Sequence, residues 1–299
     1  MRHNTISVIG AGNVGATCAY ALMLKNVCGE ILLADADLDR CAGQVSDLSD
    51  ALPFSETSRV LAADLKEAGG ADVIIITAGA AQKPGQTRLE LVDKNKQILE
   101  SILEKLEPAP ESVILVISNP VDVLTYHAQR LLPDRPAGRV FGSGTYLDTQ
   151  RLRGNLSELL NIAEQSIHAY VLGEHGNSQF VAWSESTAGG KPLREFLRES
   201  ENMEERLADK TMREAYDIIQ KKGATYYGIG ACAAKICESV LYDQKKILPV
   251  SCFLEEYDVA LSMPAVIGEN GVERVIQLRL NEDEARKMKR SVEEIRRYL

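Results

Sequence analysis

The sequence predicts an α/β protein in which a doubly wound parallel sheet is joined to a second, α+β domain. Two observations lead to this prediction. Apolar runs of strand length alternate with helical patterns as far as residue 142, as in a parallel sheet with helices on both faces. Beyond that point the pattern changes to helices, short strands and an Asn-Gly hairpin turn. We therefore divide the chain into residues 1–142 and residues 143–299.

The composition of the chain limits the binding partners and the cellular compartment that we expect. The chain has 299 residues, 45% of them apolar, which is enough to bury one large or two medium cores. Its net charge of −9 argues against nucleic acid or an anionic membrane as the main partner. The six cysteines form no C-x-x-C pair and there are only four histidines, so we expect no metal site. Since we find no signal-peptide core and no apolar run near the ~18 residues that span a bilayer, we expect a cytoplasmic protein.

The first βαβ unit has the features of a dinucleotide-binding site. A β-branched strand at residues 5–9 leads directly into G-A-G-N-V-G, and the second strand ends at Asp35. Gly10 allows a tight turn, Gly12 lets the backbone approach a pyrophosphate, and Gly15 lets the helix pack on the strand. The helix N-terminus offers free N–H groups to the phosphates. Asp35 can accept hydrogen bonds from both ribose hydroxyls and would repel a 2′-phosphate, so we expect NAD rather than NADP.

Further strands and helices complete this first domain. The predicted strands share continuous rather than alternating apolar residues, which is typical of parallel strands covered on both faces. They lie at residues 31–34, 58–62, 72–77 and 112–118, with helices at 38–48 and 89–106. The arrangement is that of a Rossmann domain, whose ligands bind at the carboxyl ends of the strands.

Two of these strand ends carry polar residues that indicate chemistry. The loop after Thr77 reads A-G-A-A-Q-K-P-G-Q-T-R and holds Gln82 and Arg88 just before a helix. It is either an ordinary solvent loop or a lid that closes over substrate. The other strand end carries Asn119-Pro120. X-Pro bonds are the common sites of cis peptides, so a cis bond that aims the Asn119 amide inward is possible, and the sequence does not decide it.

A short helix at residues 143–154 opens the second half and carries three charges. Asp148 and Arg151 are three residues apart and share one face, whereas Arg153 looks the other way. Taken alone, these charges need no functional explanation. Asp148 and Arg151 could form an i,i+3 ion pair, which contributes about 0.2–0.5 kcal/mol, and Arg153 could be a solvated arginine. We predict that the helix ends at Gly154.

The rest of the second half predicts an α+β arrangement that provides the other wall of a cleft. A strand is predicted at 167–172, and Trp183 lies on another. We expect a polar surface segment at 191–203 and one long helix at 212–242, bent at its internal glycine. The other predicted elements are helices at 156–165 and 283–298 and strands at 247–254, 259–267 and 272–280.

Six motifs occur in order across almost the whole chain, and together they resemble the lactate/malate dehydrogenase family. They are G-A-G-N-V-G, Q-K-P-G-Q-T-R, S-N-P-V-D-V-L-T, G-T-Y-L-D-T-Q-R-L-R, G-E-H-G and K-K-G-A-T-Y-Y-G-I. The pattern is most similar to that of the bacterial L-lactate dehydrogenases. This resemblance implies a homotetrameric, NAD-dependent enzyme that interconverts pyruvate and L-lactate at the end of fermentative glycolysis.

The resemblance also implies roles for residues in these motifs. His175 is expected to exchange a proton with the substrate oxygen, and Asp148 to bond the other ring nitrogen. Arg151 is expected to bind the substrate carboxylate through two hydrogen bonds, Arg88 to polarise the carbonyl, and Asn119 to help place the substrate. The hydride passes between substrate and nicotinamide, so no metal is needed. The expected cofactor contacts are Gly10, Gly12, Asn13, Val14, Gly15, Asp35, Gly79, Ala80, Ser118 and Asn119.

Gln82 decides the expected substrate. In this family an arginine at the matching position is typical of malate dehydrogenases, because oxaloacetate brings a second carboxylate that is costly to bury unpaired. The neutral Gln82, with Thr225 near the substrate methyl group, therefore favours pyruvate. The alternatives are a malate dehydrogenase or a broader 2-hydroxy acid dehydrogenase. A non-catalytic NAD-binding sensor is a further alternative, although such a protein has no need of the polar residues to which the resemblance gives catalytic roles.

Two residues match the effector site of lactate dehydrogenases that fructose 1,6-bisphosphate activates. In those enzymes an arginine two residues after the substrate arginine and a histidine seven residues before the catalytic one bind the effector. Arg153 and His168 stand at these positions, although His168 alone would be explained as an ordinary interface histidine. We therefore expect a bisphosphate site shared between subunits. Asp148 is then expected to face His175 and Arg151 to face substrate, without a mutual ion pair.

Overall fold

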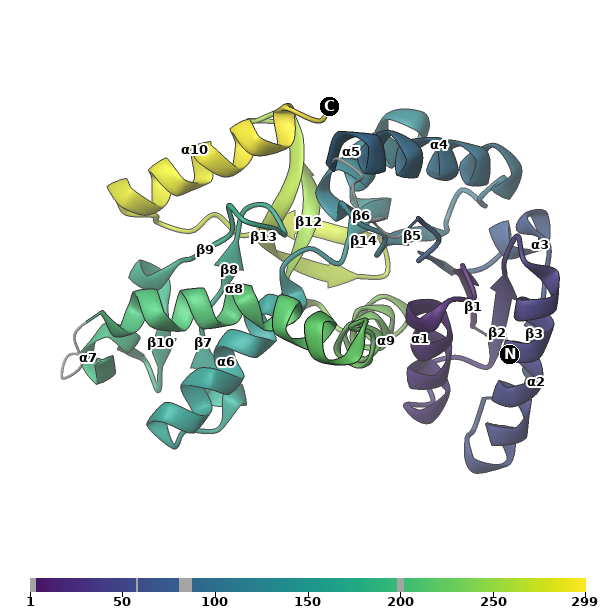
Figure 1. Ribbon diagram of the computed structural model, residues 1–299, viewed down its shortest axis with the longest axis horizontal. Helices are drawn as coiled ribbons and strands as arrows, with labels where there is room; N and C mark the ends of the chain where they lie inside the picture. The colour runs from purple at the N-terminus through teal and green to yellow at the C-terminus, as the bar shows by residue number, and fades with distance from the viewer. Residues whose placement is uncertain (1–3, 58, 81–87, 198–201) are drawn as a thin grey trace.

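The computed structural model describes residues 4–57, 59–80, 88–197 and 202–299 (Figure 1). Its centre is a nine-stranded sheet in the order β14-β13-β12-β6-β5-β4-β1-β2-β3. The strands from β6 to β3 are parallel to one another, which confirms the predicted doubly wound α/β fold. These parallel strands are β1 (Thr5–Ile9), β2 (Glu30–Ala34), β3 (Arg59–Ala62), β4 (Val73–Ile76), β5 (Val113–Val116) and β6 (Val140–Gly142).

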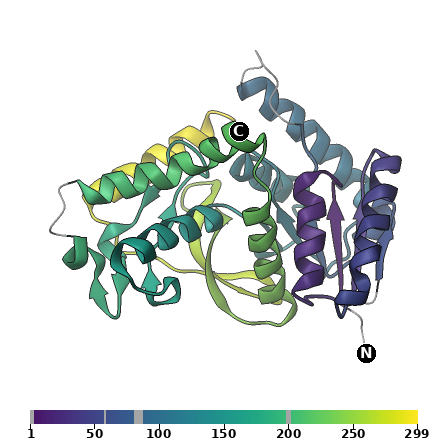
Figure 2. The ribbon, with the colours of Figure 1, turned by 60° about the horizontal axis from the view of Figure 1, so that its bottom comes forward.

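Helices cover both faces of the parallel strands, as Figures 1 and 2 show. The side chains of β4 alternate between two cores. Val73 and Ile75 pack with α1, α2 and α9, whereas Ile74 and Ile76 pack with α3, α4 and α5. Because both faces are covered, residues that point to either face have to be apolar, and this explains the continuous apolar runs in the sequence. The helices are α1 (Asn13–Leu24), α2 (Leu38–Ala51), α3 (Leu65–Gly69), α4 (Arg88–Leu106), α5 (Val121–Leu131) and α9 (Tyr227–Leu241).

Three antiparallel strands from the second half extend the same sheet. They are β12 (Lys246–Leu254), β13 (Val259–Gly268) and β14 (Gly271–Val275). Ser251 on β12 lies opposite Gly142 on β6, and the two halves of the chain meet along this edge. β14 begins at Gly271, whose φ of +80° is one that a glycine adopts without strain. β14 is shorter than predicted because its ladder ends at the bond from Ile276 N to Pro264 O, and Pro264 has no N–H to return.

The remaining helices and small strands form the second, α+β part of the molecule, and its predicted class is confirmed. One core cluster lies between α10 and the strands β12 and β13. Another lies among α6, α7, α8 and the small strands. The helices are α6 (Tyr146–Leu160), α7 (Leu193–Leu197), α8 (Met203–Lys222) and α10 (Glu282–Arg296). The small strands are β7 (Ile167–His168), β8 (Val171–Leu172), β9 (Phe180–Val181), β10 (Thr187–Ala188) and β11 (Lys191–Pro192).

Four predictions about the second half are wrong in detail. Gly154 does not end the first helix: α6 runs on to a left-handed cap at Asn161, which replaces the helix predicted at 156–165. The long bent helix is two helices, because Gly223 at φ +88° ends α8 rather than bending it. The polar segment at 191–203 contains β11 and α7, with two buried leucines. Trp183 lies in a 3-10 helix and is buried.

No helix in the described part of the chain is both long and apolar enough to cross a membrane. The last helix, α10, begins with a capping box, in which Asn281 Oδ1 accepts from Glu284 N and Glu284 Oε2 accepts from Asn281 N. The helix therefore begins one residue before the predicted start at 283. α10 lies along the strands of the second half (Figure 1), where it reaches the loop that carries His175.

Candidate active site

The glycine-rich turn between β1 and α1 has no room for side chains where two backbone segments meet. A Cβ on Gly15 would lie 1.8 Å from the carbonyl oxygen of Gly10, so α1 can pack against the turn only with glycine there. Gly10 has φ +109°, a value that other residues rarely adopt. At Gly12, by contrast, a Cβ would meet nothing within 4 Å. The N-terminal N–H groups of α1 therefore face a cradle that fits a pyrophosphate.

Asp35 lies beside this cradle, directly after β2. Its carboxylate accepts hydrogen bonds from Ala11 N at 2.5 Å and from Asp37 N at 2.8 Å. Both bonds come from backbone groups, so they fix the carboxylate against the glycine turn. Each oxygen keeps a further lone pair, and the pair of oxygens can accept from two vicinal hydroxyls.

Asn95, a buried residue of α4, ties two strand ends together and is not among the residues that the sequence predicts. Its Oδ1 accepts from Ala80 N at 2.7 Å, and its Nδ2 donates to Asn119 O at 2.8 Å. Ser118 Oγ donates to Ala78 O at 2.6 Å and links the same two segments. The segments after β4 and β5 are thus held together at the carboxyl edge of the sheet. A single asparagine in a helical pattern gives no sequence signal of such a role.

Asp148 is shared between His175 and Arg151. Its Oδ2 lies 2.7 Å from His175 Nδ1, and its Oδ1 accepts a hydrogen bond from Arg151 Nη1 at 3.2 Å. The side chains of Asp148 and Arg151 are 4% and 7% exposed, so both charges are buried. The expectation that these two residues form no mutual ion pair is therefore wrong. A carboxylate has two oxygens, and a buried charge is stable only when its partners satisfy both of them.

The first turn of α6, which carries Asp148, is fastened to two strands by buried hydroxyl groups. Thr145 N donates to Ser262 Oγ at 3.0 Å, and Thr145 Oγ1 donates to Val171 O at 2.6 Å. Thr149 Oγ1 accepts from Val171 N at 2.9 Å. These bonds fix the helix start, where the helix dipole also favours a negative side chain. The position of the Asp148 carboxylate is therefore set by the fold rather than by a mobile side chain.

The loop that carries His175 is held on two sides by buried polar groups that the sequence analysis missed. His175 N donates to Asp122 Oδ2, on α5, at 2.7 Å. On the other side Ser291, on α10, donates to Ser178 O at 2.6 Å. Within the loop, Glu174 Oε2 accepts from Ser178 N at 3.2 Å and from Ser178 Oγ at 2.5 Å. The D in S-N-P-V-D and the E in G-E-H-G are the only sequence signals, and neither indicates its partner.

Electrostatics in this cluster favour a charged imidazole. Burial alone would lower the pKa of His175, but the charge and hydrogen bond of Asp148 outweigh it and raise the pKa to about 9. Burial would likewise raise the pKa of Asp148, but the imidazolium and the Arg151 guanidinium hold it below its usual range. At neutral pH the site therefore contains one carboxylate between two cations.

The structure describes only some of the other residues predicted to bind substrate. The Asn119-Pro120 peptide is cis, and Asn119 Oδ1 accepts from Val121 N at 3.3 Å. Thr225 is half-buried in the short segment between α8 and α9. Gln82 lies outside the described residues. Arg88 is the first residue of α4, and its side chain also lies outside the described part of the chain.

Arg153 lies on a different side of α6 from Asp148, and His168 lies on β7. Arg153 Nε donates to Ala169 O at 3.1 Å, and its guanidinium lies 5.2 Å from the ring centroid of Tyr170. His168 is exposed on β7, while its neighbours Ile167 and Ala169 are buried. Both residues are therefore close to one short strand segment, 167–170.

Comparison with known proteins identifies the family. The model of the lactate/malate dehydrogenase NAD binding domain matches residues 4–142, and that of the lactate/malate dehydrogenase alpha/beta C-terminal domain matches residues 145–299. The chain belongs to the lactate/malate dehydrogenase family. It is therefore an NAD-dependent oxidoreductase.

Named members of this family are similar over almost the full chain. L-lactate dehydrogenase A of Rhizopus oryzae is 43% identical over 295 residues, which cover 98% of this chain and 92% of that protein. L-lactate dehydrogenase of Synechococcus sp. strain JA-3-3Ab is 42% identical, with coverage of 98% and 97%. The crystal structure of the minor L-lactate dehydrogenase from Enterococcus mundtii in the ligands-bound form has a TM-score of 0.95 and 37% identity, and the match covers 99% of this chain and 97% of that one.

The glycine turn and Asp35 fit the NAD that a lactate/malate dehydrogenase uses. The cradle at Gly12 is open to a pyrophosphate, and the Asp35 carboxylate is fixed where a ribose would lie next to it. Among the described residues, no group of three or more His, Cys, Asp or Glu side chains is arranged to hold a metal ion.

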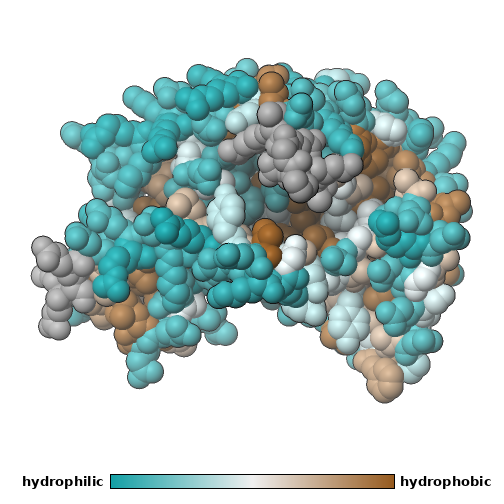
Figure 3. Space-filling view, viewed as in Figure 1, coloured by the Kyte–Doolittle hydropathy of each residue, from teal (hydrophilic) through white to brown (hydrophobic). Residues whose placement is uncertain are grey.

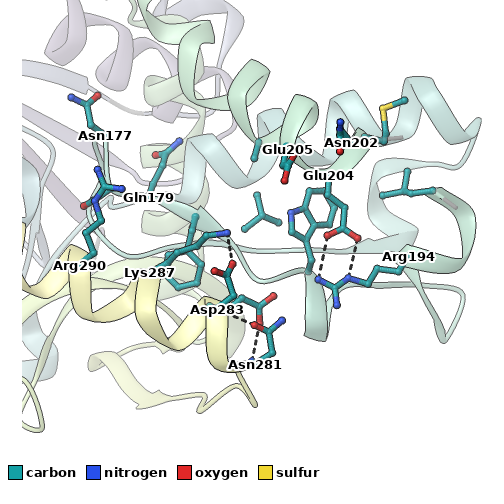
Figure 4. A pocket seen from close by; sticks show the side chains of 18 residues that line it. Asn177, Gln179, Arg194, Asn202, Glu204, Glu205, Asn281, Asp283, Lys287 and Arg290 are labelled. Atoms are coloured by element: carbon teal, nitrogen blue, oxygen red, sulfur yellow. Dashed lines mark hydrogen bonds and ion pairs between the residues drawn. The ribbon is translucent and has the colours of Figure 1, made fainter. Parts of the chain in front are cut away.

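The protein also has a cavity of about 730 Å³ beyond the His175 loop (Figure 4). It is lined by the segment 177–181 and by side chains of α7, α8 and α10. Two ion pairs cross its wall, Arg194–Glu204 at 2.9 Å and Lys287–Asp283 at 2.7 Å. None of the predicted site residues lines it. The face in Figure 3 is also hollowed, between the part that carries α6 to α8 and the part that carries α1 and α2.

The raised pKa of His175 predicts a pH-dependent contribution to stability. Since the folded pKa lies above the unfolded value of 6.5, the contribution is fully present below pH 6.5 and is lost as the pH rises through about 9. We expect the Tm advantage of the wild type over His175→Gln to be largest near pH 6 and to shrink by pH 9.5. Differential scanning calorimetry across this range measures it.

His127→Gln is the matched control for this measurement. His127 Nε2 lies 2.7 Å from a carboxylate oxygen of Glu100, but the Glu100 side chain is 42% exposed, so solvent screens the pair. We expect the wild-type advantage over this variant to be small at every pH. An advantage over His175→Gln that stays constant from pH 6 to 9.5 would contradict the charged imidazole.

Proposed function

We propose that the protein is a cytoplasmic L-lactate dehydrogenase that interconverts pyruvate and L-lactate with NAD, with a cofactor domain at 1–142 and a catalytic domain at 143–299. The observation that supports this most directly is the carboxylate of Asp148 between His175 and Arg151. One partner can exchange a proton and the other can bind a carboxylate, and a 2-hydroxy acid needs both. Relatives named L-lactate dehydrogenase at 42–43% identity support the same substrate.

His175 is the proposed acid and base. Its Nδ1 is bonded to Asp148, which leaves Nε2 as the nitrogen that faces substrate. With a pKa of about 9 the imidazole is protonated at neutral pH, so Nε2 can donate a proton to the pyruvate carbonyl oxygen. In the reverse direction the neutral imidazole takes the proton from the lactate hydroxyl, and Asp148 stabilises the imidazolium that results. NAD, when bound, supplies or accepts the hydride.

Arg151 is the proposed carboxylate-binding residue. One of its nitrogens is used by Asp148, and the guanidinium keeps further N–H groups in a planar fork that matches a carboxylate. Lysine cannot reproduce this geometry. Arg88, brought from the start of α4, is proposed to polarise the substrate carbonyl, and Asn119 and Thr225 to shape the space around the substrate.

Gln82 is proposed to set the preference for pyruvate, because a neutral amide leaves the second carboxylate of oxaloacetate without a partner. We expect the wild type to oxidise NADH faster with pyruvate than with oxaloacetate or 2-oxo-isocaproate. Gln82→Arg should raise the ratio of kcat/KM for oxaloacetate to that for pyruvate by about 10²-fold or more, as an unpaired buried charge costs several kcal/mol. Steady-state NADH oxidation with the three acids measures this.

Gln86→Arg is the control, since it adds the same charge to the same loop four residues away. It should leave the ratio nearly unchanged. A wild type that already prefers oxaloacetate would contradict the proposed substrate and favour a malate dehydrogenase.

We further propose a homotetramer activated by fructose 1,6-bisphosphate, with Arg153 and His168 in an effector site shared between subunits. His168 is exposed, and Arg153 contacts the segment 167–170 that carries it, so both can contribute to a binding site for phosphate groups. A cluster of exposed aromatic residues supports oligomerisation, because a monomer gains nothing from exposing them. Tyr20, Phe54 and Tyr227 line one hollow beside α1 and are 46%, 83% and 67% exposed.

The effector proposal predicts a separation between Arg153 and Arg151. Arg153→Gln should abolish any shift of the pyruvate saturation curve by fructose 1,6-bisphosphate and leave turnover at saturating pyruvate within about twofold. Arg151→Gln should weaken pyruvate binding with or without the effector, by the several kcal/mol of a lost charge-assisted pair. Pyruvate saturation curves between pH 5.5 and 7.5, with and without the bisphosphate, test both.

Arg130→Gln removes an exposed arginine from α5 and serves as the control, with an expected response like that of the wild type. If fructose 1,6-bisphosphate does not shift the pyruvate saturation curve of the wild type at any pH in this range, the effector site does not exist.

A further inference from the structure

The cavity beyond the His175 loop has the size and the walls of a ligand-binding site. Its volume of about 730 Å³ lies within the range of small-molecule sites, and none of the residues with proposed catalytic roles lines it. Its apolar wall is formed by side chains of the segment 180–183, of α7 and of α8, namely Phe180, Val181, Trp183, Leu197, Met203 and Ala208. A site of this kind binds its ligand by apolar contact and orients it with a few polar groups.

Trp183 provides the first of these polar groups. The residue is 7% exposed and lines the cavity, yet its indole N–H donates to none of the described residues. A buried tryptophan N–H usually has a hydrogen-bond acceptor, because leaving the donor unpaired costs free energy. This N–H is therefore available to an acceptor atom of a molecule in the cavity.

A second group of donors lies at one end of the cavity. Arg290, on α10, reaches toward the segment that carries Asn177 and Gln179 (Figure 4). Glu204 lies at the opposite end. Within the described part of the chain, Arg290 has no ion pair and the Gln179 amide group has no hydrogen bond. Asn177 Oδ1 accepts from Tyr216 Oη at 3.2 Å, which leaves the Nδ2 group of Asn177 free to donate.

Most of the other charges on the cavity wall are already paired. Arg194 donates to both carboxylate oxygens of Glu204, at 2.9 and 3.2 Å. Lys287 lies 2.7 Å from a carboxylate oxygen of Asp283. The Glu284 carboxylate accepts from two backbone N–H groups, at 2.9 and 3.1 Å. Among the described residues, the cation that this wall leaves available to an anion is therefore the guanidinium at the end next to the His175 loop.

Glu205 limits the charge that a ligand can carry. It is exposed at the start of α8, lines the cavity, and pairs with none of the described residues. Its carboxylate would repel a second anionic group on the ligand. The Arg290 guanidinium, in contrast, matches one carboxylate through two parallel hydrogen bonds. The lining therefore favours a molecule with a single carboxylate on an apolar body.

We propose that this cavity is a binding site for an organic monocarboxylate, separate from the substrate site. Arg290 binds the carboxylate together with the amides of Asn177 and Gln179, and the apolar body lies against the wall that contains Trp183. The ligand then contacts the loop of the proposed acid and base, because Asn177 is two residues after His175. The inference does not rest on the proposed reaction, since binding here needs neither NAD nor pyruvate.

Trp183 is the only tryptophan of the chain, so tryptophan fluorescence reports on this cavity directly. The probe is 4-phenylbutyrate, which has one carboxylate and an apolar body, and its neutral counterpart is 4-phenylbutan-1-ol. In a titration of the wild type without NAD, we expect the acid to change the fluorescence and to saturate at millimolar concentration. The alcohol should bind at least about tenfold more weakly, because it lacks the charge-assisted hydrogen bonds.

Two arginine variants of α10 test the position of the carboxylate. Arg290→Gln should weaken the binding of 4-phenylbutyrate by about tenfold or more and leave the affinity for the alcohol unchanged. Arg286→Gln is the matched control, since it removes an arginine of the same helix that pairs with Asp283 at 3.3 Å and does not line the cavity. It should bind the acid as the wild type does. Both side chains are exposed, so we expect both variants to fold with a Tm close to that of the wild type.

Arg151→Gln separates this site from the substrate site, because it removes the residue proposed to bind the substrate carboxylate. It should bind 4-phenylbutyrate with wild-type affinity. Loss of binding in this variant would place the probe in the substrate site and overturn the inference. Wild-type affinity in Arg290→Gln, equal affinity for the acid and the alcohol, or unchanged fluorescence of the wild type in the acid titration would also overturn it. Wild-type turnover of pyruvate in Arg151→Gln would instead overturn the proposed function and leave this inference in place.

Discussion

The site depends on one buried carboxylate with two cationic partners. Asp148 is bonded to His175 through one oxygen and to Arg151 through the other, and its side chain is almost inaccessible to solvent. Removing a partner from such a charge costs several kcal/mol, so each partner holds the others in place. In the proposed mechanism, substrate recognition and proton transfer are therefore not independent, since the guanidinium and the imidazole share the group that positions them.

The rest of the fold places this carboxylate and brings the cofactor to it. Hydroxyl groups of Thr145 and Thr149 fasten the start of α6 to Val171 on β8. The parallel strands end at one edge, where Asn95 ties the segments after β4 and β5 together. Because β12 pairs with β6, the two halves share one sheet. The second half thus places His175 and Arg151 on the side of the sheet where we propose that the first half binds NAD.

Local patterns in the sequence were enough to predict the first half of the fold, and the family motifs indicated the residues to which we assign chemical roles. Continuous apolar runs marked the parallel strands, and the glycines before α1 marked the nucleotide turn, because both have strict local requirements. Contacts between distant residues could not be predicted in this way. The link from His175 to Asp122 spans 53 residues, and the α10 contact of Ser291 with Ser178 spans 113. The sequence places Asp148 and Arg151 three residues apart, but it does not indicate that both side chains are buried.

The ends of helices in the second half could not be predicted from local sequence either. Gly154 and Gly223 look alike in sequence, yet α6 continues through the first and α8 ends at the second. The difference lies in tertiary packing, which favours a longer α6 against β7, β8 and α8 and gives Gly223 a left-handed backbone. Propensity alone does not distinguish the two cases.

The most direct test of the shared carboxylate is the titration of the His175 ring in the ligand-free enzyme, compared between the wild type and Asp148→Asn. In the wild type the midpoint should lie well above 6.5, near 9. In Asp148→Asn it should fall by at least about one pH unit, because burial of the imidazolium then meets less opposition. The same midpoint in both proteins, or a wild-type midpoint near 6.5, would contradict the account.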